Sequence, residues 1–239
     1  MADRIDKILS GQGIASRSGV RRLVKQNRVT INGSIVKKPE EKADPERDEI
    51  AVDGNVIKYK KHLYIMMNKP AGVLSASRDS RAETVIDLLP PELRRDGLFP
   101  AGRLDKDTTG FIFLTDDGEL AHSILSPKRH VYKLYEARCD RELTEQDVLH
   151  FAKGITLGEK SFLPAKMKIT APDTALVEIC EGKFHQVRLM FLSAGAKVIK
   201  LKRIRIGGVY LDENLPEGGF REMTENEIKA IKSIKEELY

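Results

Sequence analysis

Apolar and polar residues alternate at helical spacing at the start of the chain. Over residues 3–10 the apolar positions recur every three or four residues, and Gly11 and Gly13 then interrupt the pattern, which predicts a short helix. Ser16 is a favourable N-cap residue for a second helix that extends to about Gln26. The chain is therefore predicted to begin with two short helices.

Short apolar runs follow these helices and predict strands. Residues 29–31 and 34–36 flank Asn32-Gly33, and an Asn-Gly pair between apolar runs is a strong β-hairpin signal. Residues 49–52 form a further apolar run. Two helices and these strands predict a small α/β unit.

A charged segment, residues 58–62, separates this unit from a larger one that begins near Leu63. In the larger part, consecutive strand patterns outnumber helical ones, which favours an α+β fold with a large, mostly antiparallel mixed sheet. We therefore predict two domains, residues 1–60 and 61–239.

The elements of the larger domain follow from apolar runs and from helix-capping pairs. Thr144 with Asp147, and Thr224 with Glu227, have the spacing of capping boxes, and each pair predicts the start of a helix. Further helices are predicted at 84–89, 119–125 and 189–194, and strands at 63–67, 111–115, 131–137, 165–169, 175–179 and 198–206.

The composition is that of a globular protein. Of the 239 residues, 41% are hydrophobic, which suffices for a substantial core. No apolar run approaches the length of a membrane span, and the first residues lack the apolar segment of a signal peptide. Cys139 and Cys180 form no CxxC pair, which suits a reducing compartment. We expect a cytoplasmic protein without membrane contact.

Positive charge is concentrated at the N-terminal end. Residues 1–38 carry a net charge of +7 within a chain whose total is +5. Arg17, Arg21, Lys25 and Arg28 recur at helical spacing without interleaved acids, so they share one face of the second predicted helix or its exit. Such a face is either a solvated surface or a binding surface for nucleic acid. Four basic residues on one face, with no acids between them to pair with, favour nucleic acid.

Candidate chemistry centres on the loop before residues 111–115, which contains Asp105 and Asp107. These carboxylates could simply hydrogen-bond the loop. The segment from Asp105 to Thr109 also fits the Asp-x-Asp-x-Thr motif of haloacid-dehalogenase-like phosphatases, but no buried apolar strand precedes it, and repeated βα units are absent. Zinc motifs, P-loops and GxSxG elbows are also absent.

The first domain resembles the S4 RNA-binding domain over about residues 3–55. The matching stretches are Arg4-Ile-Asp-Lys-Ile-Leu9, Ser16-Arg17, Arg28-Val-Thr-Ile-Asn-Gly33 and Asp48-Glu-Ile-Ala-Val-Asp-Gly54. The resemblance implies binding to the phosphate backbone of structured RNA. Its implied contacts are Arg4, Arg17, Arg21, Lys25 and Arg28.

The second domain resembles the pseudouridine synthases, and nearly the whole chain resembles the branch of that family that carries an S4 domain. The catalytic motif is Gly102-Arg-Leu-Asp-Lys-Asp-Thr-Thr-Gly110. Corroborating stretches, in the family's order, are Met67-Asn-Lys-Pro-Ala-Gly72, Leu114-Thr-Asp-Asp-Gly118, Ser126-Pro-Lys-Arg-His130, Lys133-Leu-Tyr135, Glu181-Gly-Lys-Phe-His-Gln-Val-Arg188 and Leu201-Lys-Arg-Ile-Arg-Ile-Gly-Gly208. Within that branch the chain is most similar to enzymes that modify one uridine of 16S rRNA, and the 23S rRNA members are the alternative.

This resemblance implies roles for individual residues. Asp105 is the implied catalytic carboxylate, Tyr135 stacks on the target base, and Arg188 pairs with Asp105. Further RNA contacts are implied at Arg103, Lys133, Lys202 and Arg203. The implied reaction, the conversion of uridine to pseudouridine, gains and loses no atom, so we expect no cofactor and no metal. We also expect a monomer that acts on ribosomal RNA. A non-catalytic S4 RNA-binding protein is the remaining alternative, against which the intact Asp105, Tyr135 and Arg188 set argues.

Overall fold

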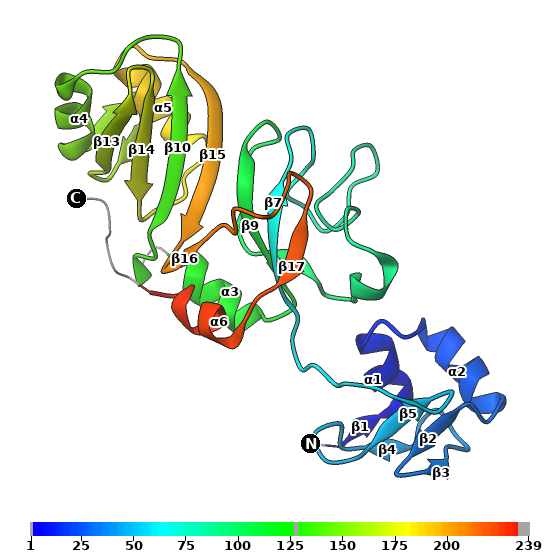
Figure 1. Ribbon diagram of the computed structural model, residues 1–239. Helices are drawn as coiled ribbons and strands as arrows, with labels where there is room; N and C mark the ends of the chain where they lie inside the picture. Colours follow the sequence, from blue (N-terminus) through cyan, green and yellow to red (C-terminus); the bar gives the residue numbers. More distant parts are fainter. Residues whose placement is uncertain (1, 127–128, 234–239) are drawn as a thin grey trace. The chain divides into compact units, whose positions relative to one another are not determined.

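The computed structural model describes residues 2–126 and 129–233, which form two compact units. Unit 1 contains the residues up to Leu63 together with Leu89–Leu98. Unit 2 contains Tyr64–Leu88 and the residues from Phe99 onward. Both units combine helices with sheets (Figure 1), as the sequence predicts.

Unit 1 is built from two helices and a four-stranded antiparallel sheet in the order β3-β2-β5-β6. Its helices are α1 (Ile5–Gly11) and α2 (Arg17–Lys25), and its sheet strands are β2 (Val29–Ile31), β3 (Ser34–Ile35), β5 (Ile50–Val52) and β6 (Asn55–Val56). Two further short strands, β1 (Asp3–Arg4) and β4 (Lys42–Ala43), pair with each other.

Local signals in the sequence set these elements. The Ser16 hydroxyl accepts a hydrogen bond from the Gly19 amide at 3.1 Å, which confirms Ser16 as the N-cap of α2. Asn32 and Gly33 adopt positive φ angles of 51° and 76°, as a tight hairpin turn between β2 and β3 requires. The apolar faces of both helices bury Leu9 and other side chains against the sheet, so the charged faces point to solvent.

The Leu89–Leu98 segment joins unit 1 although it lies far along the chain. It contains the short 3₁₀ helix η1 (Pro91–Leu93). The Arg95 guanidinium donates to the Lys60 carbonyl at 3.0 Å and to Gln12 Oε1 at 3.1 Å. These bonds fasten the segment to the end of the small α/β unit.

The helix predicted at residues 84–89 does not form, and that prediction is wrong. Thr84 instead forms an isolated bridge with Leu74, and the Asp87 carboxylate accepts from the Thr84 amide and hydroxyl at 2.9 and 2.7 Å. These bonds have the form of a capping box, but Pro90 lies six residues after Thr84 and Pro91 follows it, so the turn is not continued as a helix.

Unit 2 is organised around a nine-stranded mixed sheet whose main path runs β13-β14-β10-β15-β9-β7-β17, with β16 beside β15 and β8 beside β9. The strands are β7 (Tyr64–Lys69), β8 (Phe99–Pro100), β9 (Thr109–Thr115), β10 (Lys133–Cys139), β13 (Lys166–Ala171), β14 (Thr174–Ile179), β15 (Val198–Ile206), β16 (Val209–Tyr210) and β17 (Phe220–Glu222). The helices are α3 (Gly118–Leu125), α4 (Glu145–Ala152), α5 (Gln186–Ser193) and α6 (Glu225–Ala230). Both predicted capping boxes are present, at the starts of α4 and α6.

One parallel seam joins the two halves of this sheet. Strands β9 and β15 pair in parallel only at Thr109 with Lys202 and at Gly110 with Arg203, whereas the other strand pairs of the sheet are antiparallel. A side chain at Gly110 would lie 2.3 Å from the Arg203 carbonyl oxygen. Glycine is therefore required for this close approach, and its φ of 97° is also disfavoured for other residues.

A short hairpin, β11 (Ile155–Leu157) with β12 (Lys160–Phe162), lies outside the main sheet and was not predicted. In the part of the chain that the structure describes, no helix has the length and apolar character to cross a membrane.

Candidate active site

The loop before β9 carries Asp105 and is held on both sides of that residue. Upstream, the Leu104 amide donates to Ser75 Oγ at 3.0 Å, and the Ser75 hydroxyl donates to the Leu104 carbonyl at 2.9 Å. Downstream, the Lys69 ammonium donates to the Lys106 carbonyl at 3.1 Å and to the Thr108 carbonyl at 2.9 Å. These bonds fix the backbone from which Asp105 projects.

Lys69 has no exposed surface, and a third bond, 2.9 Å to the Pro70 carbonyl, completes its coordination by backbone oxygens. Burial lowers the Lys69 pKa to about 8, partly opposed by the nearby Asp107 and Asp105 charges. The sequence marked this lysine only as part of a family motif. The structure shows that it clamps the loop that carries Asp105.

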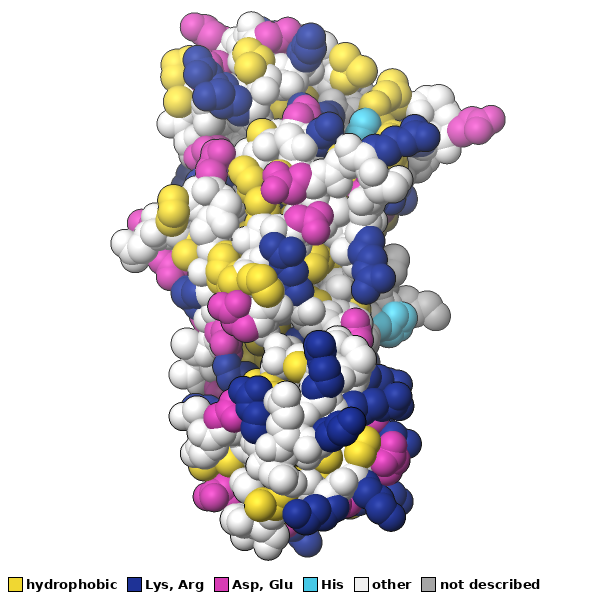
Figure 2. All heavy atoms as spheres, turned by 90° about the vertical axis from the view of Figure 1, so that its right-hand side faces the viewer, with side chains coloured by type: hydrophobic (Ala, Val, Ile, Leu, Met, Phe, Trp, Pro, Cys, Tyr) yellow, Lys and Arg dark blue, Asp and Glu magenta, His cyan; other side chains and the backbone are white. Residues whose placement is uncertain are grey.

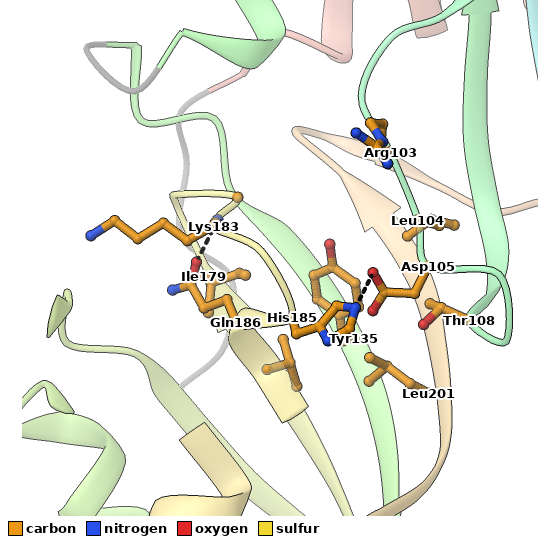
Figure 3. A pocket seen from close by; sticks show the side chains of 12 residues that line it. Arg103, Leu104, Asp105, Thr108, Tyr135, Ile179, Lys183, His185, Gln186 and Leu201 are labelled. Atoms are coloured by element: carbon orange, nitrogen blue, oxygen red, sulfur yellow. Dashed lines mark hydrogen bonds and ion pairs between the residues drawn. The ribbon is translucent and has the colours of Figure 1, made fainter. Parts of the chain in front are cut away.

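The imidazole of His185, at the N-terminus of α5, and the guanidinium of Arg188, within α5, lie near the Asp105 carboxylate. His185 Nε2 lies 3.4 Å from Asp105 Oδ1, and Arg188 Nε lies 3.8 Å from Asp105 Oδ2 (Figure 3 shows the His185 contact). The Asp105 side chain is 29% exposed, so an incoming group can reach it. Sequence reasoning did not assign a role to His185.

Arg188 has its tightest ionic contact with Asp107. Its Nη2 lies 2.8 Å from Asp107 Oδ2, while its Nη1 donates to the Val198 carbonyl at 3.2 Å. The buried Arg188 Nε has no hydrogen-bond partner among the described residues. The expected pairing with Asp105 is therefore present as a looser contact, and Asp107 anchors the guanidinium.

Tyr135 reaches the same site from β10. Its position follows from strand register, because Tyr135 stands opposite Arg203 on β15, and Arg203 stands opposite Gly110 at the start of β9. The Tyr135 side chain lines the hollow around Asp105 while most of its surface is buried (Figure 3). The Arg203 guanidinium lies 3.4 Å from the Tyr135 hydroxyl and fixes the ring from behind.

The hollow combines an aromatic ring with apolar and polar side chains. Leu104, Ile179 and Leu201 line it together with Tyr135, and Asp105, Thr108, Lys183, His185 and Gln186 add polar groups. An aromatic ring for stacking, polar groups for hydrogen bonds and a carboxylate suit the binding of a planar base. Within the described residues, no group of three or more His, Cys, Asp or Glu side chains is placed to hold a metal ion.

The basic residues predicted to contact RNA in unit 1 fall into two groups. Arg17, Arg21 and Lys25 are exposed along α2. Among the residues that the structure describes, none of the three forms an ion pair. Arg28 instead pairs with Asp53 at 2.6 Å, and Arg4 pairs with Asp6 at 2.7 Å and with Glu40. Figure 2 shows many Lys and Arg side chains gathered on the N-terminal unit, at the bottom of that view.

The predicted contacts in unit 2 also differ. Arg103 is exposed at the mouth of the hollow, and Lys202 is half-buried on β15. Lys133 and Arg203 are buried, and their cations donate to the Ile124 and Phe111 carbonyls at 3.5 and 2.8 Å.

The RNA contacts of Lys133 and Arg203 stay predictions, and both side chains are buried in this structure. Burial, reinforced by the neighbouring Arg203 charge, lowers the Lys133 pKa to about 8. Of the family-like stretch at residues 126–130, Pro127 and Lys128 lie outside the described residues.

A basic S4-like unit, and a second unit with an aspartate and a tyrosine at one hollow and an arginine beside the aspartate, define a class of enzyme that modifies bases in RNA. Family comparison gives the same two parts: the S4 domain matches residues 3–50, and RNA pseudouridylate synthase matches residues 63–193. The chain belongs to the RNA pseudouridylate synthase family, and it is a pseudouridine synthase, an isomerase.

Similar proteins extend over the whole chain. The chain is 45% identical to the "Uncharacterized RNA pseudouridine synthase YtzG" of Bacillus subtilis, with 95% of this chain and 98% of that protein covered. It is 38% identical to ribosomal small subunit pseudouridine synthase A of Escherichia coli, with 95% and 99% covered. A solved pseudouridylate synthase structure is 36% identical, with a TM-score of 0.68 and coverage of 95% and 99%.

Proposed function

We propose that this enzyme converts one uridine of 16S ribosomal RNA to pseudouridine and that Asp105 is the essential carboxylate. The observation that carries the role of Asp105 is its place in the hollow with Tyr135, between the clamped loop and α5. The preference for 16S RNA is supported by full-length similarity to a relative named for the small subunit.

The reaction requires one bond exchange at the ribose. The bond from C1′ to N1 breaks, a bond from C1′ to C5 forms, the C5 proton leaves, and N1 ends with a proton. Asp105 serves this exchange as a nucleophile or as a base, since a carboxylate can do either. In both roles the neighbouring Arg188 places positive charge 3.8 Å from the carboxylate and complements it.

The buried Arg188 Nε is placed near enough to Asp105 to donate a hydrogen bond to it after a small movement. It lies 3.8 Å from Asp105 Oδ2 without a hydrogen-bond partner in the described structure, while Asp107 and the Val198 carbonyl hold the other guanidinium nitrogens. A small movement of the Asp105 carboxylate toward Nε creates a charge-assisted hydrogen bond when substrate enters.

The target uridine must leave its stack to reach this hollow. Tyr135 then provides the flat surface on which the base rests, and its hydroxyl lies close enough to the buried Arg203 for that contact to fix the ring. The Tyr135 ring thereby sets the angle at which the base meets Asp105.

We assign RNA capture to residues 1–60 and chemistry to residues 61–239. The exposed cations of α2, Arg17, Arg21 and Lys25, provide phosphate contacts. Such contacts orient the RNA but carry little sequence information, so the choice of uridine also requires contacts near the hollow.

Pseudouridine mapping tests the proposal. We would map 16S and 23S rRNA from cells with and without the gene, and then treat each unmodified rRNA with the purified protein in the presence of a chelator. One site lost from 16S rRNA and restored by the protein is expected. A site lost from 23S rRNA would overturn the 16S assignment while retaining the reaction, and no restored site would overturn the proposed reaction.

A further inference from the structure

Phe184 exposes its ring beside the catalytic hollow. The residue is 68% exposed, the highest value among the large hydrophobic residues that the structure describes. The ring stacks on the imidazole of His185, with 3.8 Å between centroids and 17° between planes. Because His185 also contacts Asp105, one side-chain stack leads from the reacting carboxylate to an open aromatic face.

This exposure does not come from a loose loop. The buried Gln186 amide donates to Glu181 Oε1 at 2.9 Å, and the Leu163 amide donates to the same oxygen at 2.8 Å. The Lys183 amide donates to Gln186 Oε1 at 3.1 Å (dashed in Figure 3). Buried hydrogen bonds therefore hold both ends of the short segment that presents Phe184.

A second hollow adjoins the first at this segment. It is lined by Phe184, by residues of the β11–β12 hairpin, and by Lys183, which also lines the Asp105 hollow. Lys160 Nζ lies 5.4 Å from the centre of the Phe184 ring. Lys183 Nζ donates to the Ser161 carbonyl at 2.5 Å and pairs with Glu181, so it ties the hairpin to the loop.

The combination matches the chemistry of single-stranded RNA. An exposed aromatic face stacks on a nucleobase, and a nearby lysine meets the phosphate. When a uridine leaves its stack, the base next to it loses a stacking partner, and Phe184 lies one residue from the contact with Asp105. Lys160 has a flexible stem that lets its ammonium move from the ring to a phosphate.

We propose that Phe184 and Lys160 form a second nucleotide site, which holds the RNA nucleotide adjacent to the target uridine. The site rests on the proposed function in one respect, namely that the uridine at Asp105 belongs to RNA. Its consequence is selectivity, because the enzyme then binds the target together with a stacked neighbour.

Tryptophan fluorescence can read this site directly, since the chain contains no tryptophan. The variant Phe184→Trp places a single reporter where the base is expected to stack. Leu149→Trp is the matched control, because Leu149 on α4 is 59% exposed and does not line either hollow. The probes are a fragment of rRNA around the mapped uridine, the same fragment made abasic at each neighbouring nucleotide, and oligouridine.

We expect the intact fragment to quench the Phe184→Trp emission and one abasic form to lose that quenching, while the Leu149→Trp emission stays constant. Binding is followed separately by the anisotropy of end-labelled RNA. Bound RNA with unchanged emission would overturn the second site.

Kinetics provide an independent measurement. Phe184→Ala should raise KM about tenfold, as expected for one lost base–aromatic stack, with kcat nearly unchanged and Phe184→Tyr restoring KM. A fall in kcat at constant KM would instead show that Phe184 only supports His185, and would overturn the proposal.

The outcomes separate this inference from the proposed function. Isomerisation without quenching refutes the second site alone. Quenching by bound RNA without isomerisation supports the second site and refutes the proposed reaction. RNA that neither binds nor reacts refutes both.

Discussion

Arg188 is bound more tightly to Asp107 than to Asp105, with 2.8 Å to the Asp107 carboxylate and 3.8 Å to that of Asp105. The Asp107 side chain is 70% exposed, so this pair contributes little to folding stability. Its effect is positional, because it fixes the guanidinium while Nε remains directed at Asp105. Asp107 thus positions the Arg188 guanidinium whose positive charge lies beside Asp105.

Removing the first carboxylate should abolish the reaction. Asp105→Asn keeps the size of the side chain but removes the nucleophile or base, so pseudouridine formation in the target rRNA should fall below detection. RNA affinity, measured by filter binding, should stay nearly unchanged because the phosphate contacts remain. A variant that still isomerises uridine would refute the catalytic role of Asp105.

Removing Arg188 should lower activity more than removing the Asp107 carboxylate that anchors it. Arg188→Ala should lower kcat roughly 100-fold, as loss of a preorganised charged donor does. Asp107→Asn should lower kcat about tenfold, because the guanidinium remains but loses its anchor. Glu136→Gln, which neutralises an exposed acid next to Tyr135 in sequence, is the control and should leave kcat unchanged. Equal activity of Asp107→Asn and the control would remove Asp107 from the positioning role.

Replacing the buried clamp should affect both stability and rate. Lys69→Met retains most of the side-chain volume but removes the ammonium that donates to the Pro70, Lys106 and Thr108 carbonyls. Among the described residues, only the Lys106 carbonyl is seen to accept a second bond, from the Gly72 amide. The free energy of unfolding should fall by about 2 kcal/mol, a typical cost of buried groups left unsatisfied. Urea denaturation measures this fall, and kcat should fall with it because the Asp105 loop loosens. An unchanged kcat would show that the loop holds its shape without the clamp.

The same variant isolates a pH effect. The Lys69 pKa is lowered from 10.5 to about 8 in the folded protein, so between these pH values the unfolded chain binds more protons than the folded one. The Lys69 contribution to stability therefore rises with pH across this window. Urea denaturation measures this effect: from pH 8 to pH 10 the change in the free energy of unfolding should be more positive for the wild type than for Lys69→Met. Parallel curves would mean that Lys69 titrates normally.

The exposed face of α2 should control the salt dependence of RNA binding. Arg17→Ala combined with Arg21→Ala should weaken affinity and flatten the plot of log affinity against log salt concentration, since fewer counterions are released. Lys42→Ala with Arg47→Ala removes the same charge from exposed positions of unit 1 outside α2. Identical slopes for the two double variants would show that only net charge matters.

Most of the fold followed from local signals in the sequence. Ser16, Asn32-Gly33 and the two capping boxes act on their own neighbours, so their effects were predictable and are observed. The helix expected at 84–89 does not form although Thr84 and Asp87 make capping-box bonds, because Pro90 and Pro91 leave too few residues to continue it.

The site was predictable only in part. Asp105, Tyr135 and Arg188 were recognised by resemblance, and the structure brings them together. The roles of Lys69 and His185 depend on contacts between segments that are distant in sequence, so spacing alone could not show them. The burial of Lys133 and Arg203 likewise depends on the register of the sheet, which the spacing of residues does not reveal.

The parallel seam between β9 and β15 also determines when the enzyme can become active during its synthesis. The strand that carries Lys202 and Arg203 leaves the ribosome long after Asp105 and Tyr135, and Gly110 has no parallel partner until it arrives. Pairing of such distant segments is a slow, late step in folding. A nascent chain can therefore form α2, with its exposed cations, well before the pocket around Asp105 is complete. The chain can then bind RNA before it can modify it.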